Sequence, residues 1–185
     1  SGAEAAWLHL AMKIEEAILY GTPLRGFSVD WEKCFDVLPR DLLYDMMTAL
    51  GLDPKIVRTM RSFYDHVQRC FSIASMPGAF FWVALGLFQG CPLSFIGMTL
   101  MATIWSRAIE EATDGAAAPF SYADDGNVTA TTNAAVQTAL DVTYELSVAT
   151  FQTASQKKTF AWAVNKVPQL ERILRCLLYT SPSPR

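Results

Sequence analysis

The sequence has few charged residues, and this shortage limits how the protein can contact nucleic acid. Lysine, arginine, aspartate and glutamate make up 18% of the 185 residues, and the formal net charge is −3. Typical globular domains contain about 25% charged residues. A protein that wraps nucleic acid by charge alone is normally basic. Any basic surface must therefore be local, or lie on segments outside this sequence.

Histidine and cysteine are also scarce, and their arrangement argues against a structural zinc site. The sequence has two histidines and four cysteines, which are Cys34, Cys70, Cys91 and Cys176. No two of these cysteines stand at the short spacing typical of zinc ligands. Residues 1–16 lack the basic-then-apolar order of a signal peptide. We therefore expect free thiols in a reducing compartment inside the cell, the nucleus or the cytoplasm.

Apolar residues, in contrast, are abundant at 51% of the chain, which is enough for a packed core and excludes global disorder. No charged residue occurs between Cys70 and Ser106. Turn-forming residues at 76–78 and 89–92 interrupt this charge-free run, whereas one membrane span needs about 20 continuous apolar residues. We expect a core segment buried on both sides and no membrane contact. A membrane hairpin is the alternative.

The two ends of the sequence indicate a piece of a longer protein. The chain begins without methionine, inside a predicted helix. Residues 176–185 resemble a sequencing adapter translated in frame, and the alternative is an ordinary disordered Ser/Pro tail. We expect three regions: a leading helix over residues 1–23, a core over 24–165, and a disordered or artefactual tail over 166–185.

Apolar periodicity predicts five helices. The first ends at residues 21–23, and the second follows Pro39 and is closed by Gly51. The third is capped by Asp53, the fourth runs from Pro92 to about residue 113, and the fifth is capped by Asn133 and reaches about residue 150.

β-Branched and aromatic residues predict strands between these helices. The predicted strands span residues 26–30, 68–75, 79–85, 119–122, 127–130 and 158–164, with turns at 76–78 and at 123–126. Asp125-Gly126 is a typical hairpin turn dipeptide. Helices and strands alternate irregularly around one hairpin, so the fold class is α+β with a largely antiparallel sheet.

Three aspartates are placed where strands end. Asp30 closes a predicted strand, and Asp124 and Asp125 stand at the tip of the predicted hairpin. A loop tip can present carboxylates without burying their charge. Such an oxygen-only site suits Mg²⁺ or Mn²⁺, and two ions about 3.5–4 Å apart can clamp the reacting oxygens of a phosphoryl transfer. A solvated Asp-Asp-Gly turn without chemistry is the alternative for the pair alone.

Four strings in one order extend this pattern. They are Phe27-Ser-Val-Asp30 with Phe35-Asp36, Gly86-Leu-Phe-Gln-Gly-Cys-Pro-Leu-Ser94, Tyr122-Ala-Asp-Asp125 and Lys157-Lys-Thr159. Together they resemble the palm of reverse transcriptases, in particular those of non-LTR retrotransposons, over residues 24–165. The resemblance implies a polymerase palm, in which a catalytic β-hairpin packs on helices. It also implies RNA-directed DNA synthesis that joins deoxynucleotides to a primer 3′-hydroxyl.

The resemblance assigns catalytic roles to four residues. Asp30 matches the first metal-binding aspartate, Asp124 the second, and Asp125 its neighbour at the turn. The implied cofactors are two Mg²⁺ or Mn²⁺ ions. Lys158 matches a lysine near the leaving pyrophosphate, where an ammonium can stabilise charge or donate a proton. An ordinary surface lysine is the alternative for Lys158.

Further residues match the part of the family that binds nucleotide and template. Phe35 matches the aromatic residue beneath the incoming sugar, where a ring excludes a 2′-hydroxyl, although core packing also explains it. Gln89 and Gly90 match the segment beside the nucleotide and the template base, and Tyr122 opens the hairpin motif. The implied partners are an RNA template, a DNA primer and dNTPs.

The basic residues offer a weaker indication. Lys55, Arg58 and Arg61 recur every three residues, and Arg69 follows. They could line a nucleic-acid channel, or form a solvated helix face. The resemblance implies fingers before residue 1 and a thumb after residue 165, so this fragment alone is expected to be inactive. The competing hypothesis is a retroelement relic or a nucleic-acid-binding module that keeps the fold without the chemistry.

These assignments lead to a geometric expectation. Asp30 and Asp124 should lie on neighbouring strands with carboxylates about 4–7 Å apart, within reach of one bridging ion. Asp125 should point less directly at that spot. Gln89 should lie on the open side and Phe35 should floor the gap. At least one carboxylate of the Asp30 and Asp124 pair should have a raised pKa.

Overall fold

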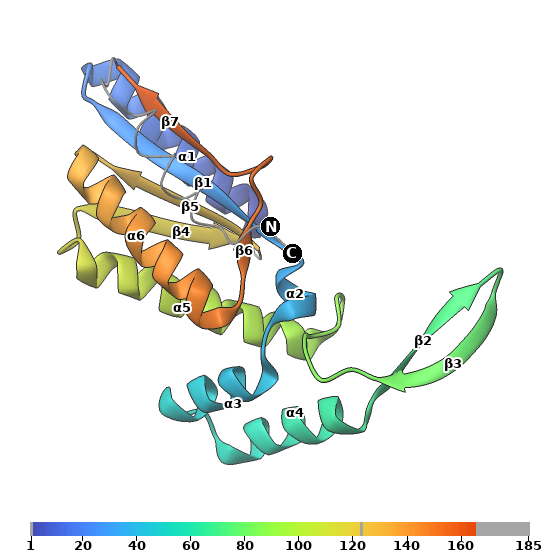
Figure 1. Cartoon of the computed structure of the whole chain (residues 1–185). Helices are drawn as coiled ribbons and strands as arrows, with labels where there is room; N and C mark the ends of the chain where they lie inside the picture. Colours follow the sequence, from blue (N-terminus) through green and yellow to red (C-terminus); the bar gives the residue numbers. More distant parts are fainter. Residues whose placement is uncertain (1, 123, 166–185) are drawn as a thin grey trace. The chain divides into compact units, whose positions relative to one another are not determined.

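A computed structural model describes residues 2–122 and 124–165, which form two compact units (Figure 1). Within these described ranges, the first unit combines the residues up to Glu32 with those from Met98 onward, and the second comprises residues 33–97. Helix α5 (Pro92–Ala112) begins in the second unit and continues into the first.

The first unit is built on a five-stranded antiparallel sheet. Its strands are β1 (Leu24–Glu32), β4 (Ala117–Tyr122), β5 (Asp125–Ala130), β6 (Thr153–Ala154) and β7 (Phe160–Val164). The order is β4-β5-β1-β6, and β7 also pairs with β1. Strand β1 is therefore central, with β5 along one side and β7 followed by β6 along the other. This arrangement confirms the α+β class and the antiparallel sheet.

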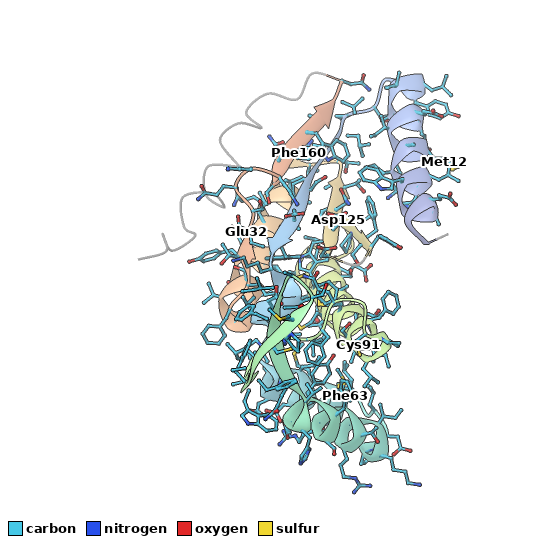
Figure 2. The ribbon with its side chains drawn as sticks, turned by 90° about the vertical axis from the view of Figure 1, so that its right-hand side faces the viewer. Met12, Glu32, Phe63, Cys91, Asp125 and Phe160 are labelled. Carbon is cyan, nitrogen blue, oxygen red and sulfur yellow. The ribbon has the colours of Figure 1, made fainter. Side chains whose placement is uncertain are left out.

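Helices lie on both faces of this sheet. Helix α1 (Gly2–Tyr20) lies on one face, and α6 (Asn133–Thr150) lies on the other (Figures 1 and 2). Side chains of β1 alternate between the faces, because successive residues of a strand point in opposite directions. Phe27 and Val29 consequently enter the apolar core, and Ser28 and Asp30 lie on the face of α1.

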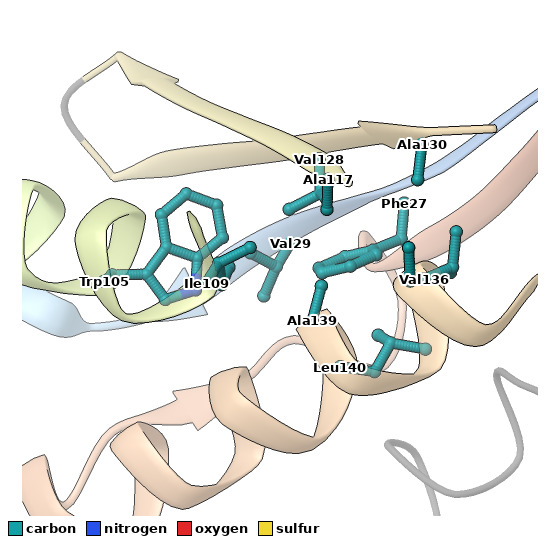
Figure 3. Packing of buried hydrophobic residues seen from close by; sticks show 11 residues of the cluster. Phe27, Val29, Trp105, Ile109, Ala117, Val128, Ala130, Val136, Ala139 and Leu140 are labelled. Atoms are coloured by element: carbon teal, nitrogen blue, oxygen red, sulfur yellow. The ribbon is translucent and has the colours of Figure 1, made fainter. Parts of the chain in front are cut away.

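The core of the first unit lies between the sheet, α5 and α6 (Figure 3). Phe27 and Val128 are fully buried there, together with Ile109 and Val136. Trp105 of α5 is buried in the same cluster, and its indole N–H donates to the Thr143 hydroxyl of α6 at 3.0 Å. The hydrogen bond satisfies the polar edge of a large buried ring.

The second unit contains short helices and a separate hairpin. Its elements are α2 (Cys34–Val37), α3 (Arg40–Ala49), α4 (Pro54–His66), β2 (Gln68–Ile73) and β3 (Met76–Trp82). Arg40 is buried and donates to three carbonyl oxygens, those of Gly86 (2.7 Å), Tyr64 (3.0 Å) and Leu85 (3.2 Å). These bonds tie α3 and α4 to the loop that precedes α5.

The β2–β3 hairpin corrects two expectations. Its turn is Ala74-Ser75, both with positive φ, and not residues 76–78, which lie in β3. Positive φ at both turn residues matches the strand twist of a two-residue hairpin, and an edge strand tolerates Pro77. The hairpin also exposes its apolar side chains, so the charge-free run is not buried throughout. The most exposed are Phe71, Ile73, Met76, Phe80 and Trp82.

The turn of the β4–β5 hairpin is also shifted from its expected place. Tyr122 pairs with Asp125, so Asp125 and Gly126 already belong to β5, and Asp124 lies in the turn. Gly126 is required by packing, because a Cβ there would lie 2.8 Å from Val29 Cγ1 and 3.0 Å from Trp105 Cη2. A close approach between strand and helix therefore explains this glycine.

All five predicted helices are present, with small changes at their starts. Asp53 caps α4 by accepting from the Lys55 N–H at 2.8 Å, as predicted. Pro39 precedes α3 instead of opening it. Thr132, and not Asn133, caps α6, because its hydroxyl accepts from the Ala135 N–H at 3.2 Å.

The helices also bear on the membrane alternative. Among the residues that the structure describes, none of the helices combines the length and apolarity needed to cross a membrane. The predictions for residues 166–185, including the adapter-like string, lie outside the described residues.

Candidate functional site

Two aspartates of the predicted site face each other across the centre of the sheet. Asp30 near the end of β1 pairs in register with Asp125 at the start of β5. Residues directly opposite each other in an antiparallel ladder place their side chains on the same face. Asp125 is thus the direct cross-strand neighbour of Asp30, contrary to the expectation that it points less directly at the site. The reason is the short turn, which puts Asp125 inside the strand.

Asp124 lies beside this pair, at the turn itself. It is half-buried, whereas Asp125 is exposed. The predicted spacing between the Asp30 and Asp124 carboxylates stays a prediction. Within the described ranges, no three histidine, cysteine, aspartate or glutamate side chains gather closely enough to form a metal cluster.

The loop between β6 and β7 holds Asp30 through three separate bonds. The Ser155 N–H donates to the Asp30 carbonyl at 2.7 Å, and the Asp30 N–H donates to the Thr159 hydroxyl at 3.5 Å. The Lys158 ammonium donates to Asp30 Oδ1 at 3.0 Å. The loop is closed on itself, because Lys158 and Thr159 both donate backbone bonds to the Ser155 carbonyl. Backbone and side chain of Asp30 are therefore fixed by one short segment.

The electrostatics of the site reflect this crowding. Partial removal of water raises the pKa of the Asp125 carboxyl, the charges of Asp124 and Asp30 raise it further, and Lys158 lowers it. The pKa of Asp125 is therefore raised first by desolvation and then by neighbouring like charges, and the expectation for the Asp30 and Asp124 pair stays a prediction. The hydrogen bond to Asp30, and then its charge, raise the pKa of the exposed Lys158 ammonium. Three carboxylates and one ammonium thus form one interacting group.

A row of polar residues continues from the aspartates along the same face of the sheet. The Ser28 hydroxyl donates to Asn127 Oδ1 at 2.6 Å, directly across the ladder, and Lys13 of α1 donates to the Thr129 hydroxyl at 3.3 Å. Sequence reasoning missed this row. The available signal was the two-residue spacing of Ser28 and Asp30, and of Asp125, Asn127 and Thr129.

A cavity lies beside the turn between β4 and β5. Asp124, Asp125, Trp31 and Trp105 contribute to its lining. Gln152 also lines it, is nine-tenths buried, and its Nε2 has no hydrogen-bond partner among the described residues. Sequence reasoning did not single out Gln152, because an isolated glutamine carries no motif.

The remaining predicted residues are distributed over both units. Tyr122 pairs with Asp125 in the first unit and is exposed. Phe35, Gln89 and Gly90 belong to the second unit. There the Phe35 carbonyl accepts from the Leu87 N–H, two residues before Gln89. The second unit thus brings the Phe35 backbone to the loop that carries Gln89, and the roles of these residues stay predictions.

The basic group of the second unit is mostly exposed. Lys55, Arg58 and Arg61 lie on α4, and Arg61 forms an exposed ion pair with Asp41 at 3.2 Å. Arg69 lies apart from them, on β2. The channel hypothesis for this group stays a prediction.

Solved structures of low sequence identity share this fold. Telomerase from Candida tropicalis, in complex with a TWJ fragment of telomeric RNA, matches with a TM-score of 0.67 at 15% identity, over 88% of this chain and 29% of that one. Telomerase from Candida albicans, in complex with the same kind of fragment, matches with a TM-score of 0.68 at 13% identity, over 92% and 31%. The chain therefore spans about a third of the length of these telomerases, and the likeness shows the fold.

A comparison with family sequence models identifies the family directly. The model described as "Reverse transcriptase (RNA-dependent DNA polymerase)" matches residues 22–171, most of the chain. This range includes both facing aspartates, the hairpin turn and the loop of Lys158. The chain therefore belongs to the reverse transcriptase family.

Proposed function

We propose that this chain is the palm of an RNA-directed DNA polymerase that adds deoxynucleotides to a primer 3′-hydroxyl. The observation that carries the proposal is the pairing of Asp30 with Asp125 at the edge of the hairpin turn, with Asp124 adjacent and Lys158 bonded to Asp30. A purely structural sheet has no need of like charges directly opposite each other, since such pairs are destabilising. A cationic ligand between them would account for their presence here.

The side chains fit divalent cations in chemistry and charge. Asp30, Asp124 and Asp125 offer only hard carboxylate oxygens, which Mg²⁺ and Mn²⁺ prefer. Partial burial and then the charges of Asp124 and Asp30 raise the pKa of Asp125, and a bound cation would relieve the repulsion that contributes to this shift. We propose that these three aspartates hold two such ions, which would stabilise the charge on the attacking and leaving oxygens.

The protein's own groups position and neutralise the reactants. The β6–β7 loop bonds both the backbone N–H and the backbone carbonyl of Asp30, so its carboxylate is oriented before substrate binds. Lys158 carries a raised pKa and remains protonated near neutral pH. It can therefore stabilise the departing pyrophosphate or donate its proton to it.

The family resemblance suggests nucleotide- and template-binding residues in each unit. We propose that the Phe35 ring excludes a 2′-hydroxyl, and that Gln89, Gly90 and Tyr122 contact the nucleotide and the RNA template. The Cys91-Pro92-Leu93-Ser94 string that follows Gly90 supports a non-LTR retroelement origin. Activity belongs to the parent protein, which would supply fingers and thumb.

Primer extension on an RNA template by the full-length parent protein tests this proposal. Asp30→Asn and Asp124→Asn should each lower the rate at least about 100-fold, because each removes about 3 kcal/mol or more of transition-state stabilisation. Asp45→Asn, at an exposed position of α3, is the matched control and should extend normally. Near-normal extension by Asp30→Asn would refute the metal-ligand role. A parent protein that binds RNA but never extends a primer would support the relic hypothesis.

A further inference from the structure

The second unit contains a groove that the proposed chemistry does not use in full. The groove has a volume of about 420 Å³ and is lined by Asp36, Arg69, Cys70, Leu87, Phe88 and Gln89. Only Gln89 among these residues has a role in the proposed function. Arg69 is the one cation of the lining, and about a quarter of its side chain is exposed.

The guanidinium of Arg69 is held by stacking, and its hydrogen-bonding capacity is largely unused. Its Cζ lies 4.4 Å from the centroid of the Phe88 ring. Nη1 lies 3.7 Å from Asp36 Oδ1, a loose ion pair with a carboxylate that is nearly half exposed. Nε and Nη2 are buried, and neither has a hydrogen-bond partner among the described residues. The N–H groups of Nε and Nη2 point the same way and form the fork that binds two oxygens at once.

A second arginine of the same unit interacts with the charge of Arg69. Arg40 lies behind the same loop, where it donates to the carbonyls of Leu85 and Gly86. Burial lowers the pKa of Arg40 and the charge of Arg69 lowers it further, whereas the charge of Asp65 acts in the opposite direction. Two arginines therefore repel each other around the loop that leads to Gln89. Buried charged donors without acceptors are costly, so a further anion would stabilise this arrangement.

We propose that the groove binds a phosphate group through the Arg69 guanidinium, with Gln89 also in the lining. A phosphate offers several oxygens to a bidentate guanidinium, and Arg is well suited to that geometry. Arg69 lines the groove and about a quarter of its side chain is exposed, so a phosphate in the groove can approach the guanidinium. This inference deepens the proposed function, because it names an anion contact for a substrate of the polymerase. The phosphate belongs to a nucleic-acid strand or to a free nucleotide.

The salt dependence of binding tests this proposal on the whole 185-residue chain. Each phosphate contact to a single strand contributes about 0.7 to the slope of log K against log salt. Arg69→Met keeps the apolar stem over Phe88 and removes the charge. It should reduce the slope for a short single-stranded RNA by about 0.7, and weaken binding roughly tenfold at physiological salt. Arg69→Lys should restore the slope and recover affinity in part, because Lys keeps the charge without the fork.

Controls separate this contact from a general loss of charge or of fold. Arg107→Met removes the same charge from an exposed position of α5 and should leave the slope unchanged. Thermal unfolding of each variant verifies that Arg69→Met remains folded. Equal slope losses in Arg69→Met and Arg107→Met would overturn the proposal. A second arm measures binding of a deoxynucleoside triphosphate alone, and a loss confined to this arm assigns the phosphate to the free nucleotide.

The outcome is independent of the catalytic proposal. Asp30→Asn should lose primer extension in the parent protein and keep the Arg69-dependent salt slope in this chain. If Asp30→Asn loses extension but Arg69→Met changes neither RNA binding nor nucleotide binding, only the phosphate site is refuted. A normal Arg69 effect in a parent protein that never extends a primer would leave the phosphate site in place and refute the polymerase.

Discussion

The described part of the chain contains two antiparallel sheets, which differ in what covers them. The five-stranded sheet has α1 on one face and α5 and α6 on the other (Figures 1 and 2). The two-stranded sheet of β2 and β3 pairs with no third strand in the described part of its unit. Phe27 in the first sheet is fully buried, whereas Phe80 in the second is 66% exposed. The same residue type therefore stabilises one sheet and faces solvent on the other.

The difference shows how a fold can support unfavourable chemistry. Strand β1 carries its apolar residues on one face and a polar row ending in Asp30 on the other. Burial of the apolar face offsets the repulsion between Asp30 and Asp125. An isolated two-stranded hairpin is marginal in water by itself. A carboxylate pair placed there would have no comparable core beneath it.

A matched pair of phenylalanine substitutions tests the difference in burial between the two sheets most directly. Phe27→Ala should lower the free energy of unfolding by about 3–5 kcal/mol, because it removes a fully buried ring from the core. Phe80→Ala should cost less than about 1 kcal/mol, because its ring is largely exposed. Urea unfolding followed by circular dichroism measures both. Equal losses would mean that the two-stranded sheet is covered as fully as the central one.

A glycine in each sheet gives a smaller effect of the same kind. Gly126→Ala should destabilise by roughly 1–3 kcal/mol, because the new Cβ would press on Val29 and Trp105. Gly78→Ala in β3 should change stability by less than about 1 kcal/mol, since its Cβ would meet only the Phe71 carbonyl oxygen, at 3.2 Å. The same unfolding measurement applies. If Gly126→Ala leaves stability unchanged, packing does not require this glycine, and its preference for hairpin turns is the better explanation.

Much of this architecture could be predicted from local patterns. Apolar periodicity found all five long helices, and the Asp53 cap marked the start of α4. The turn of β4–β5 was misplaced because Asp125-Gly126 has the local chemistry of a turn, whereas Gly126 is needed for a contact with distant Trp105. The exposure of β2–β3 was missed because an apolar run does not reveal whether anything packs on it.

The residues of the site were likewise predictable from local motifs, whereas their contacts with one another were not. Asp30 and Asp124 followed from motifs, but the pairing of Asp30 with Asp125 depends on the register between two strands far apart in sequence. The contact of Lys158 with Asp30 requires the β6–β7 loop to fold back onto β1. Likewise, only the packed structure shows that Arg69 lies over Phe88. Composition alone cannot reveal such contacts between residues that are distant in sequence.

The smallest expected effect on stability comes from charge, in which the two sheets also differ. Strands β2 and β3 carry no carboxylate, whereas Asp125 faces Asp30 in the large sheet and has a raised pKa. A raised pKa in the folded state means that the fold binds this proton more tightly than the unfolded chain does. Stability is therefore lost as pH rises from the ordinary carboxyl pKa through the raised one.

Asp125→Asn should raise the thermal midpoint at pH 7 by roughly 1–3 °C and reduce this loss, because a cross-strand charge pair contributes roughly 0.2–1 kcal/mol. Asp45→Asn should leave the loss unchanged, and a midpoint lowered at pH 7 by Asp125→Asn would show that the carboxylate stabilises the metal-free sheet.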